Sequence, residues 1–259
     1  MPIPPSCIEK FNWAHEHFQR LHAEVKSFFD VKPYEVRANP NTDCTEYRFY
    51  VDFTRPIPGP RWGLMLGDGI HCLRSTLDHS VYAIAVKESA TDPPPKFRSL
   101  EFLITRDEDH WNKSVWHIET LSGPVIAAIK GLQEHANPAE FFMRPLGGLQ
   151  EMDNADKHRR IHLAVVIPTF SESNVSGLIP GQQCQIEFHV RPLKPQTPFA
   201  TLKLDRPTPN VQVGSNLTLE IGLPHIRENG RETTILVWSS VDAMTQAVTY
   251  DLNALAPYC

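Results

Sequence analysis

The segment from residue 62 to residue 87 constrains the fold more than any other part of the chain. Its apolar residues recur at helical spacing over about seven turns. They are Leu66, Ile70, Leu73, Leu77 and Ile84. A helix of this length gains most of its stability by packing its apolar face against other elements. The sequence therefore predicts a central helix with further elements packed around it.

The same helical spacing recurs in several other segments. It predicts helices over residues 8–29, 124–135 and 146–166, and a final helix capped by Ser239 or Ser240. Residues 55–60 read Arg-Pro-Ile-Pro-Gly-Pro, and this run interrupts regular structure before the central helix. We therefore expect the central helix to begin after a break.

Alternating apolar and polar residues predict strands in two parts of the chain. Residues 46–54 alternate in this way and are expected to pair with residues 34–37 as a hairpin. A short strand is expected at residues 100–104, and from about residue 168 further strands are expected at 185–190, 200–204, 217–221 and 234–238. The predicted class is α+β: an N-terminal helical bundle, residues 1–167, with an inserted β-hairpin at 34–54, followed by a β-rich part, residues 168–259, with a final helix.

Composition limits the functions that this chain can have. The 259 residues are 41% hydrophobic and 21% charged, which is typical of a soluble globular protein with a real core. The net charge of −5 argues against non-specific coating of nucleic acid, because that role needs a net positive field. A local basic patch is still compatible with this balance.

The sequence shows no sign of a secretion signal or of a membrane-spanning segment. The first residues, MPIPPSCIEKF, lack a basic and apolar leader, and no run approaches the roughly 18 apolar residues that span a bilayer. The five cysteines are scattered singly, which favours free thiols over a zinc ribbon or a disulfide framework. We therefore expect a cytoplasmic protein with no membrane partner, no metal and no cofactor.

Ionisable and hydroxyl side chains follow one another along one face of the predicted central helix. They are Asp68, His71, Ser75, Asp78 and Tyr82, with Arg74 and His79 on the two flanks. Exposed helix faces are usually rich in Lys and Glu, but this face has neither before Lys87. Short Asp, His and Ser side chains are poorer helix formers, so their presence needs another reason. The pattern indicates a candidate site.

A second polar array lies on the predicted helix at 146–166, in the run from Asp153 to Arg160. There Asp156 occupies a position in the stripe of Leu149 and Met152, where an apolar residue is expected. A carboxylate directed into a helix interface needs a cation or hydrogen-bond donors. We therefore expect Asp156 to pair with Arg74 or His71 of the central helix.

The six residues Arg74-Ser75-Thr76-Leu77-Asp78-His79 form an R-x4-H element. This element resembles the R-x4-6-H motif of the HEPN superfamily (higher eukaryotes and prokaryotes nucleotide-binding), whose helical domains include metal-independent endoribonucleases. The segments LGDGIHCLRSTLDH and NADKHRRIH also resemble a family of bacterial proteins, and that likeness implies no activity. The HEPN resemblance implies RNA cleavage or nucleotide binding.

The chemistry of the R-x4-H element is compatible with RNA cleavage. His79 would act as general base or acid, and Arg74 would stabilise charge on the scissile phosphate. Residues five apart on a regular helix lie about 140° apart, so an irregular helix or a second copy of the chain, in a homodimer, would have to bring both to one phosphate.

The predicted site residues divide into two groups. The candidate catalytic residues are Arg74, His79, Asp78 and His71, and the candidate substrate-binding residues are Lys157, His158, Arg159, Asp68, Ser75 and Asp156.

Two alternatives stay open at this point. In the first, histidines and carboxylates of the two helices bind a metal, with His71, Asp78, His79, Asp156 and His158 as ligands. In the second, the chain is a non-catalytic binding or scaffold module in which Arg74, His71 and Asp156 form a structural polar network. Activity that a chelator abolishes would favour the metal. An open cleft at Arg74 would favour a site, and a dry, fully paired contact would favour the scaffold.

Overall fold

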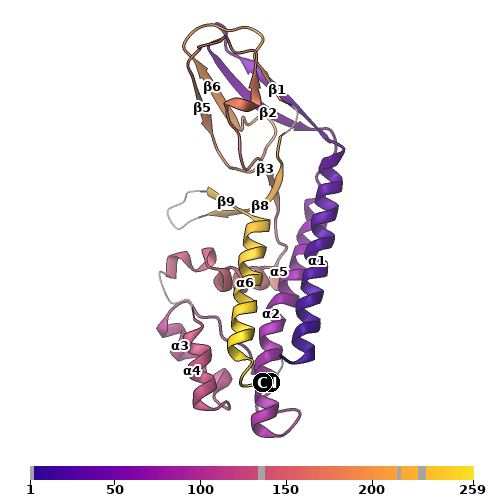
Figure 1. Ribbon diagram of the computed structural model, residues 1–259, viewed down its shortest axis with the longest axis vertical. Helices are drawn as coiled ribbons and strands as arrows, with labels where there is room; N and C mark the ends of the chain where they lie inside the picture. Colours follow the sequence, from indigo (N-terminus) through magenta and orange to yellow (C-terminus); the bar gives the residue numbers. More distant parts are fainter. Residues whose placement is uncertain (1–2, 134–137, 215–216, 227–231) are drawn as a thin grey trace. The chain divides into compact units, whose positions relative to one another are not determined.

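This computed structural model describes residues 3–133, 138–214, 217–226 and 232–259, and its contacts divide the chain into two compact units. Unit 1 comprises Met1–His22, Gly63–Ile161 and Ser239–Cys259, and unit 2 comprises Ala23–Trp62 and His162–Trp238. The predicted α+β class is confirmed. Figure 1 shows the elements of both units.

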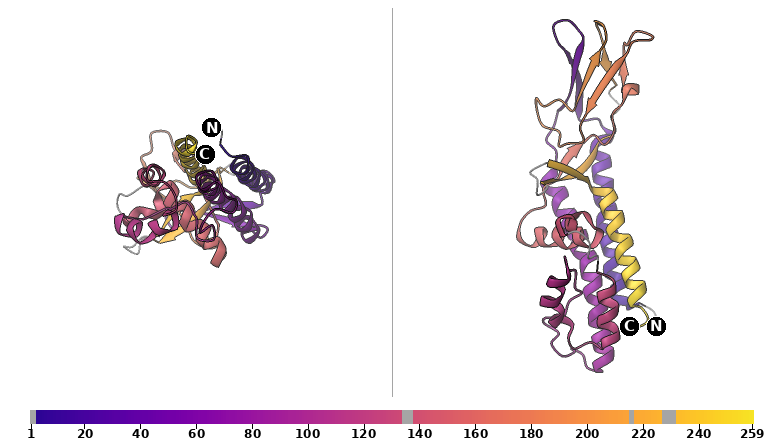
Figure 2. Two further views of the ribbon diagram at one scale, coloured as in Figure 1. Left: turned by 90° about the horizontal axis from the view of Figure 1, so that it is seen from below. Right: turned by 90° about the vertical axis from the view of Figure 1, so that its left-hand side faces the viewer.

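Unit 1 is helical. Its elements are α1 (Pro5–Asp30) as far as His22, α2 (Gly59–Ser89) from Gly63, α3 (Glu108–Ser114), η1 (Val115–Ile118), α4 (Gly123–Gly131), η2 (Pro138–Met143), α5 (Pro145–His158) and α6 (Val237–Leu255) from Ser239. Within this unit α2 lies between α1 and α6 (Figures 1 and 2). The five apolar residues that predicted the central helix are all fully buried on α2. That prediction is confirmed.

Unit 2 is built from antiparallel strands. One sheet has the order β1 (Tyr34–Pro40), β2 (Glu46–Phe53), β6 (Ala200–Leu204), β5 (Cys184–Phe188). A second has the order β3 (Ala164–Val166), β8 (Glu220–Ile226), β9 (Glu232–Leu236), and β4 (Val175–Ser176), which follows η3 (Glu172–Asn174), pairs with β7 (Gln212–Val213). Alternate residues of β2 enter one core with Phe199 and Leu202.

The two units combine the segments of the chain differently from the two regions predicted from the sequence. The hairpin of β1 and β2 joins the strands of unit 2, where Tyr47 of β2 is paired with Leu202 of β6. The final helix α6 joins unit 1 from Ser239. Each segment thus belongs to the unit in which its apolar face is buried. Strand β2 completes the core of the sheet, and α6 buries Val241, Val248 and other residues in the helical unit.

Two predicted elements are corrected by the structure. The helix expected at 146–166 ends at His158, and residues 164–166 form β3, in which Val165 pairs with Ile221. The strand expected at 100–104 is absent, because side chains rather than another strand bond its backbone. The helix expected at 124–135 ends at Gly131, and residues 134–135 lie outside the described residues.

Helix α6 begins at Val237, so Ser239 and Ser240 lie inside it and do not cap it as predicted. Helix α2 begins at Gly59, within the run that was expected to precede it. The other predicted elements are present with shifted ends. The predicted strand at 200–204 matches β6, whereas β5, β8 and β9 overlap the predicted segments with ends displaced by up to five residues. Helix α3 was not expected from the sequence; Asp107 caps it by accepting a hydrogen bond from the backbone of His110. Among the described residues, no helix has the length and apolar character needed to cross a bilayer.

Candidate functional site

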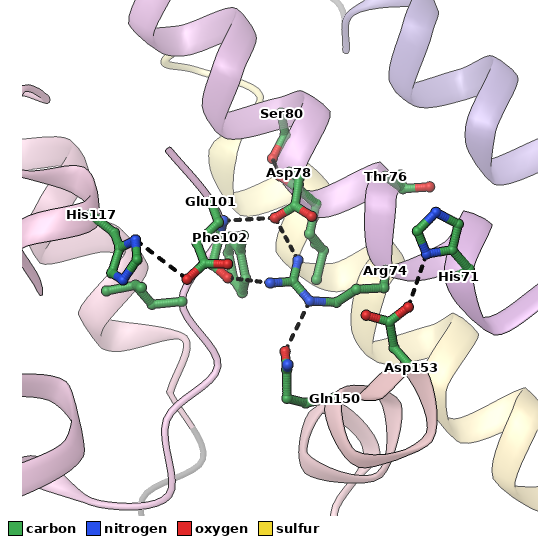
Figure 3. A network of polar contacts seen from close by, with 12 residues as sticks. His71, Arg74, Thr76, Asp78, Ser80, Glu101, Phe102, His117, Gln150 and Asp153 are labelled. Atoms are coloured by element: carbon green, nitrogen blue, oxygen red, sulfur yellow. Dashed lines mark hydrogen bonds and ion pairs between the residues drawn. The ribbon is translucent and has the colours of Figure 1, made fainter. Parts of the chain in front are cut away.

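Arg74 is the most enclosed of the predicted site residues, with 4% of its surface exposed. Its guanidinium donates three hydrogen bonds to three different parts of unit 1. Nε donates to Oε1 of Gln150 on α5 (3.0 Å), Nη1 to Oδ1 of Asp78 on α2 (2.6 Å), and Nη2 to the carbonyl of Phe102 (2.7 Å). Figure 3 shows the guanidinium between these acceptors. Arg74 therefore connects α2, α5 and the segment around residue 102.

Asp78 closes this arrangement into a ring. The Oδ1 atom that accepts from Arg74 also accepts from the backbone nitrogen of Phe102 at 2.9 Å. Both backbone groups of Phe102 are thus bonded to side chains of α2. Gln133 does the same for the next residues, since it donates to the carbonyl of Leu103 and accepts from the nitrogen of Thr105. These bonds explain why the segment is extended without belonging to a sheet.

His79 lies in different surroundings from Arg74. It is half-buried, and desolvation together with the nearby charge of Lys10 on α1 lowers the pKa of its imidazole below the usual 6.5. Helix α2 is α-helical through residues 74–79, so no local irregularity turns the two side chains to one side. Within one chain, the structure does not bring the two ends of the R-x4-H element together.

His71 forms the contact that the sequence had assigned to Asp156. Its Nδ1 lies 3.0 Å from Oδ1 of Asp153, whose side chain is fully buried, while the imidazole itself is 49% exposed. The other carboxylate oxygen, Oδ2, lies 2.6 Å from Nζ of Lys157 as an ion pair. Asp153 thus sits between two cationic or donor groups, and the open edge of His71 faces away from it (Figure 3).

Asp156 does not bond Arg74, so the expected pairing is corrected. Its carboxyl group packs instead on the backbone of Gly67, where an added Cβ would come within 1.9 Å of Oδ1. Burial is the main cause that raises the pKa of this carboxyl above 3.8, followed by the nearby charges of Asp68 and Asp153, while His71 opposes the rise. Asp156 therefore keeps its proton to higher pH than an ordinary aspartate.

The other predicted binding residues lie on the exposed end of α5 or on the outer side of α2. His158 and Arg159 are exposed, as is their neighbour Arg160, and none of the three has an ion pair within the described part of the chain. Asp68 is exposed and Ser75 half-buried. Lys157 forms an ion pair with Asp153. Among the described residues of this region, the basic side chains without an ion pair are therefore those that follow Lys157.

The metal alternative is not supported by the geometry. Across the residues that the structure describes, no group of three or more His, Cys, Asp or Glu side chains is arranged to hold a metal ion. Three of the five proposed ligands face different partners: His71 bonds Asp153, Asp78 bonds Arg74, and His79 lies near Lys10.

Two residues of this site were missed by the sequence reasoning. Gln150 and Asp153, three apart on α5, bond Arg74 and His71, three apart on α2. The sequence did contain a signal for Asp153. Lys157 follows it by four residues, which is the spacing of an ion pair within a helix. For Gln150 there was no comparable signal.

Comparison of this chain with protein-family models, with curated proteins and with solved structures finds no match. The resemblance to the HEPN superfamily therefore stays a prediction from one short motif.

Proposed function

We propose that the chain is an RNA-cleaving or nucleotide-binding protein whose acid–base centre is His71, oriented by Asp153. The observation that carries this proposal is the pairing of a half-exposed imidazole with a fully buried carboxylate at 3.0 Å. A buried carboxylate that accepts from Nδ1 fixes the ring orientation and leaves Nε2 as the atom available to a substrate. An imidazole oriented by a carboxylate is one arrangement that supports general base catalysis.

Basic side chains near the end of α5 that have no acidic partner within the described residues support a phosphate-bearing substrate. His158, Arg159 and Arg160 have no carboxylate partner within the described part of the chain, unlike Arg61, which bonds Glu24, and Arg106, which bonds Glu151. An exposed guanidinium without an internal partner is free to bind phosphate through paired N–H groups. A ribose 2′-hydroxyl beside such a phosphate is the group from which His71 would take a proton.

Arg74 and Asp78 have a different part in this proposal from the one that the R-x4-H resemblance implies. The three hydrogen bonds of Arg74 described above go to protein acceptors, so its charge is already used within the fold. Arg74 and Gln150 hold α2 and α5 together one turn from His71 and Asp153. They would therefore position the acid–base pair and would not contact the phosphate.

The test is cleavage of a single-stranded RNA by the purified chain, with and without a chelator. We expect cleavage that the chelator does not abolish, a loss of about 10²-fold or more in His71→Gln, and a marked loss in Asp153→Asn. His79→Gln separates this proposal from the R-x4-H motif, because it should retain cleavage here. His15→Gln, on the exposed side of α1, is the control, and circular dichroism checks that each variant is folded.

A second candidate function is a scaffold module without catalysis. The enclosure of Arg74 favours it, because a buried, fully bonded ion network can fix the packing of helices without any chemistry. Wild-type protein that leaves RNA intact under all conditions, combined with a large loss of stability in Arg74→Ala, would favour the scaffold over the acid–base centre.

A further inference from the structure

Gly67 and Asp156 form a contact that the bonds of the polar network do not explain. The Asp156 carboxyl occupies the space that any side chain at residue 67 would need, since a Cβ there would lie 1.9 Å from Oδ1 and 2.4 Å from Cγ. The absence of a side chain at Gly67 therefore leaves the space that this carboxyl occupies. No hydrogen bond to another side chain accounts for that position within the described residues.

This position is one helical turn from the imidazole of the proposed acid–base centre. Gly67 and His71 are four residues apart on α2, so they share a face about 6 Å apart along the axis. Asp153 and Asp156 are three residues apart on α5, and the first of them bonds His71. The carboxyl of Asp156 and the imidazole of His71 therefore lie on the same face of the contact between α2 and α5.

We propose that Asp156 is the general acid that protonates the leaving oxygen when His71 acts as the base. This inference rests on the proposed function, because it assigns the second proton transfer of the same reaction. In-line displacement at phosphorus places the attacking and leaving oxygens on opposite sides, so acid and base must be separate groups several ångströms apart. A spacing of about one helical turn meets that requirement.

The step balances as follows for RNA. The 2′-hydroxyl gives its proton to Nε2 of His71 while its oxygen forms a bond to phosphorus. The bond between phosphorus and the 5′-oxygen breaks, and Asp156 gives its proton to that oxygen. The products are a 2′,3′-cyclic phosphate and a 5′-hydroxyl; His71 is left protonated and Asp156 ionised, and exchange with water restores both.

The charges around Asp156 are compatible with this role. Asp68 from α2 and Asp153 from α5 both disfavour its ionised form, and His71 from α2 favours it. Burial, followed by the two carboxylates, raises the pKa of Asp156, so this carboxyl keeps its proton to higher pH than an ordinary aspartate. Arg160 is also close to this face of α2, because its Cγ lies 4.0 Å from the place that a Cβ on Gly63 would take.

The test compares two phosphodiesters that differ in their need for an acid. The first is a dinucleotide with a 5′-ribose leaving group, and the second is a nucleoside 3′-(4-nitrophenyl phosphate), whose leaving group departs without a proton. We expect Asp156→Asn to slow the dinucleotide by about 10²-fold and to leave the nitrophenyl ester nearly unchanged. His71→Gln should slow both. The rate of the wild type on the dinucleotide should pass through a maximum with pH, and Asp156→Asn should lose one limb.

Gly67→Ala provides an independent displacement of the same carboxyl. Alanine is the better helix former, so this variant should stay folded while its Cβ pushes the Asp156 carboxyl aside. It should slow the dinucleotide selectively, as Asp156→Asn does. The controls are Gly131→Ala, whose Cβ would meet no atom within 4 Å, and Asp109→Asn, an exposed carboxylate on α3.

Each other outcome overturns the inference. Equal slowing of both esters in Asp156→Asn would indicate a binding or structural role, and an unchanged dinucleotide rate in both variants would remove Asp156 from the reaction. If the wild type cleaves neither ester, the proposed function fails and the assignment of an acid fails with it. If Asp156→Asn does not fold, the result with Gly67→Ala decides.

Discussion

Arg74 illustrates how one buried cation can satisfy several backbone and side-chain groups. Its three hydrogen bonds reach Gln150, Asp78 and the carbonyl of Phe102, and the last of these lies in a fully buried residue. Removing the guanidinium leaves that carbonyl without its donor and Asp78 without its cation. A group buried without a partner costs more than an ordinary hydrogen bond contributes.

We therefore predict that Arg74→Ala lowers the free energy of unfolding by about 3 kcal/mol. The measurement is urea denaturation followed by circular dichroism. Arg20→Ala is the matched control, because Arg20 also bonds a carboxylate four residues away, Glu16, but both side chains are about half exposed or more. We expect that control to stay close to the wild type. A similar, small loss in both variants would contradict the structural role of Arg74.

At the residue scale, the sequence predicted the polar face of α2 but not the partners of its members. His71, Arg74 and Asp78 were recognised from their spacing, and all three take part in the network. The sequence placed Asp156 in the apolar stripe of α5, whereas in the structure Asp153 is fully buried and meets His71. The pattern also extended this helix to residue 166, eight residues beyond its last residue, His158.

At the element scale, close packing of α2 against the end of α5 depends on a second glycine. A Cβ on Gly63 would lie 2.3 Å from the carbonyl oxygen of Ile161, three residues beyond the last residue of α5. Because that oxygen belongs to the backbone, it cannot move aside as a flexible side chain would. The size of the residue at position 63 therefore limits how closely the segment that follows α5 can pack against α2.

We predict that Gly63→Ala destabilises the protein by about 1–2 kcal/mol even though alanine favours helix. Gly131→Ala in α4 is the comparison, because its Cβ would enter open space and should raise stability by about 0.5 kcal/mol. Thermal unfolding of the two variants measures both effects. Stabilisation by alanine at residue 63 as well would refute the close contact.

The elements that the sequence predicted well are those with one long apolar stripe. Helix α2 and strand β6 match their patterns, because burial of one face decides both. The segment 100–104 has the composition of a strand, but Asp78 and Gln133 bond its backbone before another strand can. These side-chain bonds come from residues 24 and 30 positions away and leave no local pattern.

At the scale of the whole molecule, each unit is assembled from separate stretches of chain. Unit 1 needs Gly63–Ile161 and also the last 21 residues, Ser239–Cys259, while unit 2 needs Ala23–Trp62 together with His162–Trp238. The sequence indicated a single boundary near residue 167, because composition changes there. Composition reports local preference and carries no information on which distant stretch completes a core.

We predict that a fragment of residues 1–167 does not fold cooperatively. It lacks α6, whose Val241, Met244, Val248, Leu252 and Leu255 are buried, and it lacks β6, to which β2 pairs. Circular dichroism should show helix without a sharp thermal transition, and a dye that binds exposed apolar surface should bind the fragment more than the full chain. A cooperative transition at the midpoint of the full chain would contradict this prediction.

The dependence of unit 1 on its last 21 residues also governs how the protein is made. Helix α2 emerges from the ribosome early, but α6 emerges only after the whole of unit 2 has been synthesised. At ordinary rates of translation, the stretch of roughly 150 residues between Ser89 and Ser239 takes about 7–30 s. For that interval the apolar side of α2 that α6 covers stays open on every nascent chain, and protection by chaperones would matter most then.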